Sequence, residues 1–186
     1  MISKIQFFIT VFSDRIYCSF LNLRWWKMIY LVISDLHVPT RQSEIPGIFL
    51  EILDEVDGVI ALGDFVNLDT VLFFQQSTRN FFAVHGNMDE YDVKNYLPDR
   101  KLVLISGFTV GLCHGWGSPY GIRKRISELF KEKPQLILYG HTHVPDETSE
   151  NGILFLNPGS AMKGGSYGLL KIENTEVNFE VKKIEY

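Results

Sequence analysis

The sequence MIYLVISDLH, which begins at residue 28, sets the pattern for most of the chain. Its apolar run at 28–34 is typical of a buried strand, and Asp35 and His37 follow that strand directly. Apolar residues at helical spacing over 45–56 come next, and a second short apolar run occupies 58–64. Strand, helix and strand in this order predict an α/β fold, with polar residues placed where the strands end.

The remaining segments extend this pattern and then change it to hairpins. We expect further helices at 68–79 and 118–131, and further strands at 80–87, 101–106, 108–115, 135–143, 152–160, 166–173 and 176–185. Ser106 and Gly107 separate two of these strands, which indicates a hairpin, and the last two strands alternate like a half-buried hairpin. Helices early and hairpins late favour a single domain, residues 28–186, with two packed β-sheets and helices outside.

The composition is that of an ordinary globular protein. Of the 186 residues, 46% are hydrophobic and 22% are charged, which excludes a chain that is mostly disordered. The net charge of -4 provides no basic field, so we expect no stable binding of nucleic acid. Two cysteines, Cys18 and Cys113, are too few for a disulfide framework, and a reducing, cytoplasmic location is expected.

Residues 1–27 differ from the rest of the chain. Their longest uncharged run, IQFFITVFS, has nine residues, whereas a membrane-spanning helix needs roughly 18 to 20, so we expect no membrane association. Asp14 and Arg15 interrupt the apolar part, which argues against a signal peptide. The segment is interpreted as an N-terminal extension, either a strand or helix packed on the domain or an artefact of the start site, with Met28 as the natural start.

Histidine, aspartate and asparagine residues gather in short clusters that each close an apolar run. The clusters are Asp35-Leu36-His37, Gly63-Asp64, Gly86-Asn87-Met88-Asp89, Cys113-His114-Gly115 and Gly140-His141-Thr142-His143. Ligands of α/β folds bind at the carboxyl ends of strands, where these clusters are expected. In an extended segment residues i and i+2 point the same way. Asp35 with His37, and His141 with His143, could therefore each direct two ligands at one point. The coincidence predicts a metal site.

The motifs SDLH, GD, HGNMD, CHG, GHTH and NPGS, in this order and at these intervals, resemble those of the calcineurin-like metallophosphoesterase family. The resemblance runs from Met28 to the C-terminus and is strongest to the small bacterial and archaeal phosphodiesterase branch. It implies a four-layer α-β-β-α sandwich with two divalent metals at the strand ends. By this resemblance one metal is held by Asp35, His37 and His143, the second by Asn87, His114 and His141, and Asp64 bridges both.

The resemblance also implies a reaction. A metal-bridging hydroxide would be the nucleophile, so no side chain is expected to act as one. Imidazole and carboxylate ligands suit Mn, Ni, Fe, Co or Zn, without choosing between them. The expected function is that of a metal-dependent phosphodiesterase acting on small phosphate diesters or nucleotide-type substrates. The alternative is a non-catalytic protein-interaction module, because the family includes a eukaryotic trafficking-complex subunit that keeps the fold with an impaired metal site.

Three positions depart from the family pattern. Met88 stands where many relatives have a histidine that protonates the leaving group, which favours diesters over monoesters. No arginine follows Gly63-Asp64, which argues against a phosphoprotein substrate. Trp116 replaces a second histidine after CHG, where it could stack on a base or cover the core.

Other polar residues have less specific expectations. His85 could contact substrate or belong to a turn, and Asp89 is expected to orient a ligand or a loop. The turn 157–160, NPGS, is expected to shape the rim of the site. The basic run 123–125 is expected to form a solvated helix face, with binding of substrate phosphate as the alternative.

Overall fold

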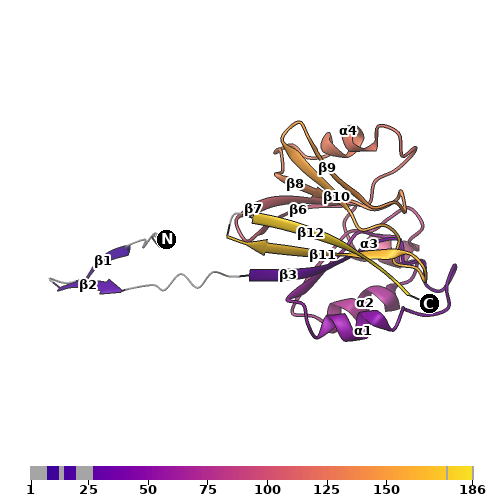
Figure 1. The fold of residues 1–186 in the computed structure, drawn as a ribbon, viewed down its shortest axis with the longest axis horizontal. Helices are drawn as coiled ribbons and strands as arrows, with labels where there is room; N and C mark the ends of the chain where they lie inside the picture. Colours follow the sequence, from indigo (N-terminus) through magenta and orange to yellow (C-terminus); the bar gives the residue numbers. More distant parts are fainter. Residues whose placement is uncertain (1–7, 13–14, 20–26, 175, 186) are drawn as a thin grey trace.

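The computed structural model describes residues 8–12, 15–19, 27–174 and 176–185 (Figure 1). Two five-stranded sheets form its centre. The first sheet has the order β12 (Glu176–Lys183), β11 (Ser166–Glu173), β3 (Lys27–Ile33), β4 (Gly58–Ala61) and β5 (Asn80–Ala83). The second has the order β6 (Arg100–Ile105), β7 (Phe108–Cys113), β8 (Leu136–Leu138), β10 (Ile153–Asn157) and β9 (Asp146–Glu150).

Each sheet mixes parallel and antiparallel strands. In the first sheet β3, β4 and β5 run parallel, and β11 pairs antiparallel with both β3 and β12. In the second sheet β7, β8 and β10 run parallel, while β6 and β9 are antiparallel edges. The predicted hairpins β6–β7 and β11–β12 are therefore confirmed. The parallel strands of both sheets supply the carboxyl ends after which the polar clusters occur.

The alternation of side chains along β3 explains why the sheets pack into layers. Tyr30 and Val32 lie in the core between the two sheets, with Leu112 and Leu138 of the second sheet. Leu31 and Ile33 point to the opposite face, where helices cover them. A strand that is buried on both faces is apolar throughout, as β3 is from Met28 to Ile33 after the exposed Lys27.

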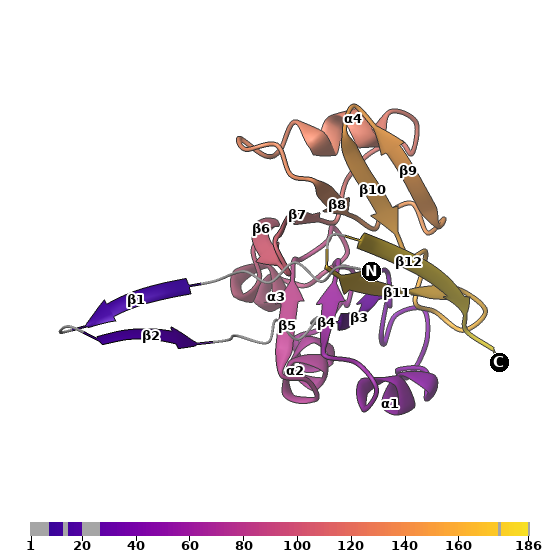
Figure 2. The ribbon, with the colours of Figure 1, turned by 60° about the vertical axis from the view of Figure 1, so that its left-hand side comes forward.

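Helices cover the outer faces of both sheets. Helices α1 (Ile48–Leu53), α2 (Leu68–Gln76) and α3 (Tyr91–Tyr96) contribute Phe49, Val71, Phe74 and Val93 to the core outside the first sheet (Figure 2). Helix α4 (Ile122–Ser127) packs on the second sheet through Ile122 and Ile126. The predicted α/β fold, a four-layer α-β-β-α sandwich, is confirmed. Within the part of the chain that the structure describes, no helix has the length and apolar character needed to cross a membrane.

Two elements were absent from the sequence-based prediction. Helix α3 buries only Val93 among its six residues, so it carries almost no apolar periodicity. Strand β9 has the sequence DETSE and lies at a sheet edge, where polar side chains are favoured. Neither element has the hydrophobic pattern on which the prediction depended.

The predicted helices were too long. Helix α4 begins at Ile122 because Gly121 has a φ of +70°, a left-handed conformation that does not continue a helix. The predicted helix at 118–131 therefore starts too early. It also ends too late, because α4 ends at Ser127. Helix α2 ends at Gln76 rather than 79, and α1 is shorter than 45–56.

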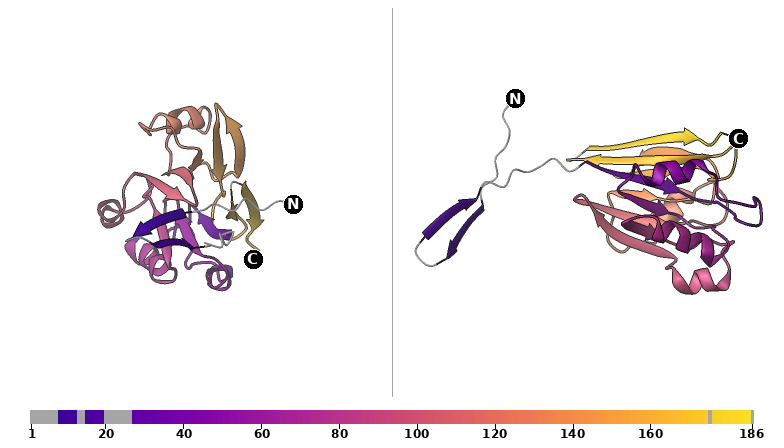
Figure 3. Two further views of the ribbon diagram at one scale, coloured as in Figure 1. Left: turned by 90° about the vertical axis from the view of Figure 1, so that its left-hand side faces the viewer. Right: turned by 90° about the horizontal axis from the view of Figure 1, so that it is seen from below.

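Residues 8–12 and 15–19 form β1 and β2, an antiparallel pair that is a separate two-stranded sheet (Figure 3). Lys27 is the first residue of β3, and residues 1–7, 13–14 and 20–26 of the extension lie outside the described residues. The interpretation of 1–27 as an extension of a domain at 28–186 stays a prediction.

Candidate functional site

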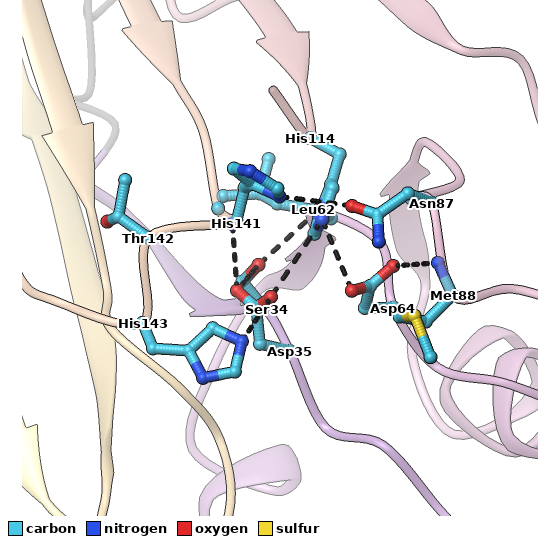
Figure 4. Close-up of polar contacts among 12 residues, drawn as sticks. Ser34, Asp35, Leu62, Asp64, Asn87, Met88, His114, His141, Thr142 and His143 are labelled. Carbon is cyan, nitrogen blue, oxygen red and sulfur yellow. Dashed lines mark hydrogen bonds and ion pairs between the residues drawn. The ribbon is translucent and has the colours of Figure 1, made fainter. Parts of the chain in front are cut away.

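The seven residues that the sequence singled out follow five strands that end at one edge of the sandwich. Strands β3, β4 and β5 of the first sheet and β7 and β8 of the second supply them. The residues are Asp35, His37, Asp64, Asn87, His114, His141 and His143. Figure 4 labels Asp35, Asp64, Asn87, His114, His141 and His143, which are gathered around one point. The fold therefore brings together residues more than a hundred positions apart.

The first group of side chains comprises Asp35, His37 and His143. The Asp35 Oδ1 atom lies 3.1 Å from His143 Nε2 and 3.9 Å from His37 Nε2. The two imidazole Nε2 atoms are 3.3 Å apart. Asp35 and His37 are buried, whereas the side chain of His143 is 31% exposed. This group can hold one metal ion, with His143 on the solvent side.

The second group comprises Asp35, Asp64 and His114, all of them buried. The His114 Nε2 atom lies 3.3 Å from Asp64 Oδ2 and 3.8 Å from Asp35 Oδ1. Asp64 Oδ2 is also 3.8 Å from His37 Nε2 of the first group. The Asp64 carboxylate thus lies between the two groups, although Asp35 also belongs to both.

Asn87 and His141 lie beside these groups and contact each other. His141 Nδ1 is 3.0 Å from Asn87 Oδ1, and His141 Nε2 is 2.8 Å from the carbonyl oxygen of Gly117. A neutral imidazole carries one proton, so in this arrangement only one of the two ring nitrogens can donate. The lone pair of the other nitrogen then faces the lone pairs of an oxygen, and the two repel. A bound cation would remove this repulsion.

Asp35 is oriented by hydrogen bonds to only one of its two oxygens. The Ser34 hydroxyl donates to Asp35 Oδ2 at 2.6 Å, and the His141 N–H donates to the same oxygen at 3.0 Å. Asp35 Oδ1 is buried and has no hydrogen-bond partner among the described residues. A buried carboxylate oxygen is costly to leave unsatisfied, so this oxygen is fitted to a ligand such as a metal.

His114 and Asp64 are held in the same way. The His114 Nδ1–H donates to the Leu62 carbonyl at 2.7 Å, and Asp64 Oδ1 accepts the Met88 N–H at 2.7 Å. In the described part of the chain, His114 Nε2 is buried without a hydrogen-bond partner. Each side chain is fixed by one atom and presents the other to the same space. The oxygen and imidazole donors fit Mn, Fe, Co, Ni or Zn.

The site shifts the pKa values of its ionisable groups. Burial acts to raise the pKa of Asp64, but the contact with His114, the Met88 N–H and the charge of His37 outweigh it, so the pKa is lowered. Burial likewise acts to lower the pKa of His114, but Asp64 and Asp35 reverse this effect and raise it. Burial lowers the pKa of His37. Carboxylates that stay ionised beside imidazoles are suited to bind a cation.

The backbone of the ligand loops is left-handed, not extended. Asp35, His37, Asp64, His141 and His143 have φ between +54° and +69°. The expected extended backbone is therefore wrong. Asp35 and His37 still converge on one point, as expected, whereas His141 and His143 reach opposite sides of the site (Figure 4). Residues other than glycine adopt this conformation at a cost of about 1–3 kcal/mol each, so tertiary contacts must maintain it.

Two glycines allow the loops to approach each other closely. A Cβ atom on Gly86 would collide with the carboxylate of Asp64, and a Cβ on Gly140 would collide with the Ser34 hydroxyl. The loops after β5 and β8 could therefore not approach these side chains with any larger residue. Glycine at both positions is a requirement of the site.

Asp89 organises the loops around Asp64, as the sequence indicated. Its Oδ2 accepts the N–H groups of Asp64 at 3.0 Å and Gly86 at 2.7 Å, and its Oδ1 accepts the Val66 N–H at 2.7 Å. The side chain is buried. One carboxylate therefore joins the loop after β4 to the loop after β5.

The turn at 157–160 lies against the ligand loops. Asn157 Nδ2 donates to the Gly140 carbonyl at 2.9 Å, and the Ser160 hydroxyl donates to the Asp35 carbonyl at 2.8 Å. Both side chains are buried, so this turn supports the site from beneath rather than forming its rim. The expectation of a rim position is therefore wrong.

The remaining residues that the sequence singled out can also be placed. Trp116 is 45% exposed, which leaves both of its expected roles open, and Met88 is 47% exposed beside Asn87. His85 is half-buried, and its Nδ1 contacts the Gly86 carbonyl. The basic run is not simply solvated, because Arg123 pairs with Asp146 and Glu150.

The sequence analysis missed the atoms that orient the ligands. Ser34 stands inside the quoted motif SDLH, so its position beside Asp35 was visible in principle. The carbonyl groups of Leu62 and Gly117 have no signal in the sequence, because any residue supplies a carbonyl.

Comparisons with known proteins agree with this geometry. The sequence profile of the calcineurin-like phosphoesterase superfamily domain matches residues 28–175. A probable metallophosphoesterase of Methanothermobacter thermautotrophicus is 31% identical over 160 residues, which are 83% of this chain and 91% of the relative.

Two solved structures are similar in fold. A Thermotoga maritima protein, solved by solution NMR, has a TM-score of 0.73 and 49% identity, over 84% of this chain and 99% of that one. Wild-type Vps29 of Entamoeba histolytica, crystallised with zinc, has a TM-score of 0.66 and 27% identity, over 84% of this chain and 98% of that one.

Proposed function

The chain belongs to the calcineurin-like phosphoesterase superfamily, and from this premise we propose that it is a metal-dependent phosphodiesterase acting on small phosphate esters. The observation that carries the proposal is the set of buried donor atoms left without partners at one point. Asp35 Oδ1 and His114 Nε2 lie 3.8 Å apart, and the described residues offer neither of them a hydrogen bond. Their closest remaining contacts are ionic ones, to His143 Nε2 at 3.1 Å and to Asp64 Oδ2 at 3.3 Å, so the pair is fitted to a shared ligand.

The proposed metal ligands are those of the family pattern. Asp35, His37 and His143 would hold one ion, Asn87, His114 and His141 a second, and Asp64 would bridge them. When bound, the two ions would polarise the phosphoryl oxygens and acidify a water molecule. Asp35 and Asp64 contribute two negative charges, so two divalent cations would leave a net positive site that attracts phosphate anions.

The residues around the ligands support this role by fixing them in place. The Ser34 hydroxyl and the His141 N–H hold Asp35 Oδ2, which keeps the other oxygen directed at the ions. The Leu62 carbonyl holds the proton of His114 on Nδ1 and leaves Nε2 free to coordinate. Preorganised ligands of this kind lower the cost of assembling the charged site.

The preference for diesters is argued from Met88. Its side chain is 47% exposed beside Asn87, so it can meet a substrate, but a thioether cannot donate a proton to a leaving group. A monoester with a poor leaving group needs such a donor. Diesters with acidic leaving groups do not, and these are the proposed substrates.

Removal and return of metal test the reaction class. Chelated, dialysed protein is expected to lose hydrolysis of bis(p-nitrophenyl) phosphate, and one or more of Mn, Ni, Co, Fe or Zn is expected to restore it. Turnover of phenyl phosphate, a monoester with a poor leaving group, measured in parallel, should be slower than that of the diester. Hydrolysis that persists at full rate after complete removal of metal would contradict the proposal.

Met88→His is expected to raise monoester turnover relative to diester turnover by at least about tenfold, because general acid catalysis typically contributes 10²–10⁴-fold. The ratio of kcat/KM for phenyl phosphate, a monoester with a poor leaving group, to that for bis(p-nitrophenyl) phosphate is the measurement. Met88→Leu serves as the control, since it keeps the size and lacks a titratable group. An unchanged ratio in Met88→His would mean that position 88 does not set the preference.

A second candidate function is a protein-interaction module without catalysis, favoured by the likeness to Vps29. The complete set of donor types at the seven positions argues against it. Absence of hydrolysis with every metal, although the protein binds metal, would make this candidate the better one.

A further inference from the structure

Large apolar side chains are exposed on the loops that carry three of the proposed metal ligands. Trp116 comes two residues after His114, Met88 directly follows Asn87, and Val144 directly follows His143; their side chains are 45%, 47% and 63% exposed. Exposed apolar groups beside a polar site indicate a ligand with an apolar part. A phosphate group alone has no apolar surface to pack against these side chains.

Trp116 belongs to a loop, 115–121, that rests directly on the site. The Gly117 carbonyl lies 2.8 Å from His141 Nε2, so the residue next to Trp116 hydrogen-bonds to a proposed metal ligand. Trp116 directly precedes Gly117, and consecutive Cα atoms are about 3.8 Å apart, so the backbone of Trp116 lies close to that contact. The loop is a wall of the site rather than a remote surface turn.

Arg125 of α4 holds this loop in one conformation. Its guanidinium donates to the carbonyl groups of Trp116 at 3.0 Å, of Tyr120 at 2.9 Å and of Ser118. Three carbonyls bound by one planar group define the path of the whole loop. A tryptophan on such a loop has an exposed side chain on a backbone that is already held in place, so the loop loses little conformational entropy on binding a ring.

We propose that Trp116 forms a subsite that stacks on a planar aromatic ring of the substrate, next to its phosphate, and that Arg125 is the positioning residue of this subsite. The substrate class is therefore an aryl or nucleoside phosphodiester rather than an aliphatic one. This inference rests on the proposed function for the position of the phosphate. Indole is suited to the role because its π-face stacks on any planar ring without hydrogen-bond readout.

Equilibrium binding tests the subsite without any turnover. Phenylphosphonate and methylphosphonate both carry a phosphonate that cannot be hydrolysed by cleavage of a P–O ester, and they differ in the ring. Calorimetry on the full chain with a fixed Mn²⁺ concentration is expected to give about tenfold tighter binding of phenylphosphonate. Trp116→Ala should abolish this preference and leave methylphosphonate binding unchanged, whereas Trp116→Phe should keep most of it.

The positioning role of Arg125 has its own control on the same helix. Arg125→Ala is expected to reduce the phenyl-to-methyl affinity ratio at least about threefold, while Lys124→Ala, an exposed neighbour, should leave it unchanged. A wild-type protein with equal affinity for the two phosphonates, or a preference that survives Trp116→Ala, would overturn the subsite.

The outcomes separate this inference from the proposed function. Hydrolysis of diesters with a substrate preference that Trp116→Ala leaves intact would overturn the subsite and keep the phosphodiesterase. A phenyl preference that depends on Trp116, in a protein that hydrolyses no ester with any metal, would support the subsite and contradict the phosphodiesterase.

Discussion

Asp64→Asn is expected to lower kcat for bis(p-nitrophenyl) phosphate at least about a thousandfold and to reduce bound metal below two ions per chain. Asp64 Oδ2 lies 3.3 Å from His114 and 3.8 Å from His37, so this carboxylate faces both proposed ions. Amide replacement removes the negative charge that they would share. A loss of several kcal/mol of charge stabilisation in the transition state corresponds to at least about three powers of ten in rate.

The asparagine variant keeps the volume of the side chain and an oxygen to accept the Met88 N–H. The fold should therefore survive, and Asp64→Ala should give the same loss of activity with a larger loss of stability. Asp69→Asn is the matched control, because it makes the same chemical change on an exposed residue of α2. Full activity of Asp64→Asn with two metal ions bound per chain would refute the assignment of the bridge.

The layers of the fold follow from patterns visible in the sequence. The uninterrupted apolar run of β3 predicts a strand buried on both faces, and Tyr30 and Leu31 indeed enter different cores. Almost every residue of such a strand is buried and therefore apolar, so the strand is easy to recognise in the sequence. The polar edge strand β9 bears no such signal, because backbone pairing with β10 rather than burial of side chains holds it.

The residue types of the site could be predicted, but not their local geometry. Asp35 and His143 were recognisable from their positions after apolar runs. The left-handed backbone at both residues could not be read from the sequence, because aspartate and histidine are merely tolerated there. Their conformation depends on distant partners, such as the pairing of the Asp35 N–H with the Gly63 carbonyl at 3.0 Å. Tertiary contacts therefore decide what local preference leaves open.

Asp89→Ala is expected to lower the free energy of unfolding by about 3–5 kcal/mol, because it leaves buried N–H groups of Asp64, Val66 and Gly86 without acceptors. Each unsatisfied buried donor costs about 1–3 kcal/mol, less whatever water can enter to replace the carboxylate. For a chain of this size the change corresponds to a decrease in Tm of roughly 10 °C. Denaturant unfolding and thermal melting of the variant measure it.

The same substitution should weaken metal binding even in the folded protein, because the Asp64 N–H and the Gly86 N–H lose the carboxylate that joins their loops. Asp92→Ala, in the exposed first turn of α3, is the control and should cost less than about 1 kcal/mol. A variant at Asp89 as stable as this control would show that the three hydrogen bonds contribute little. Normal stability with weakened metal binding would instead mean that Asp89 positions the metal ligands and does not stabilise the fold.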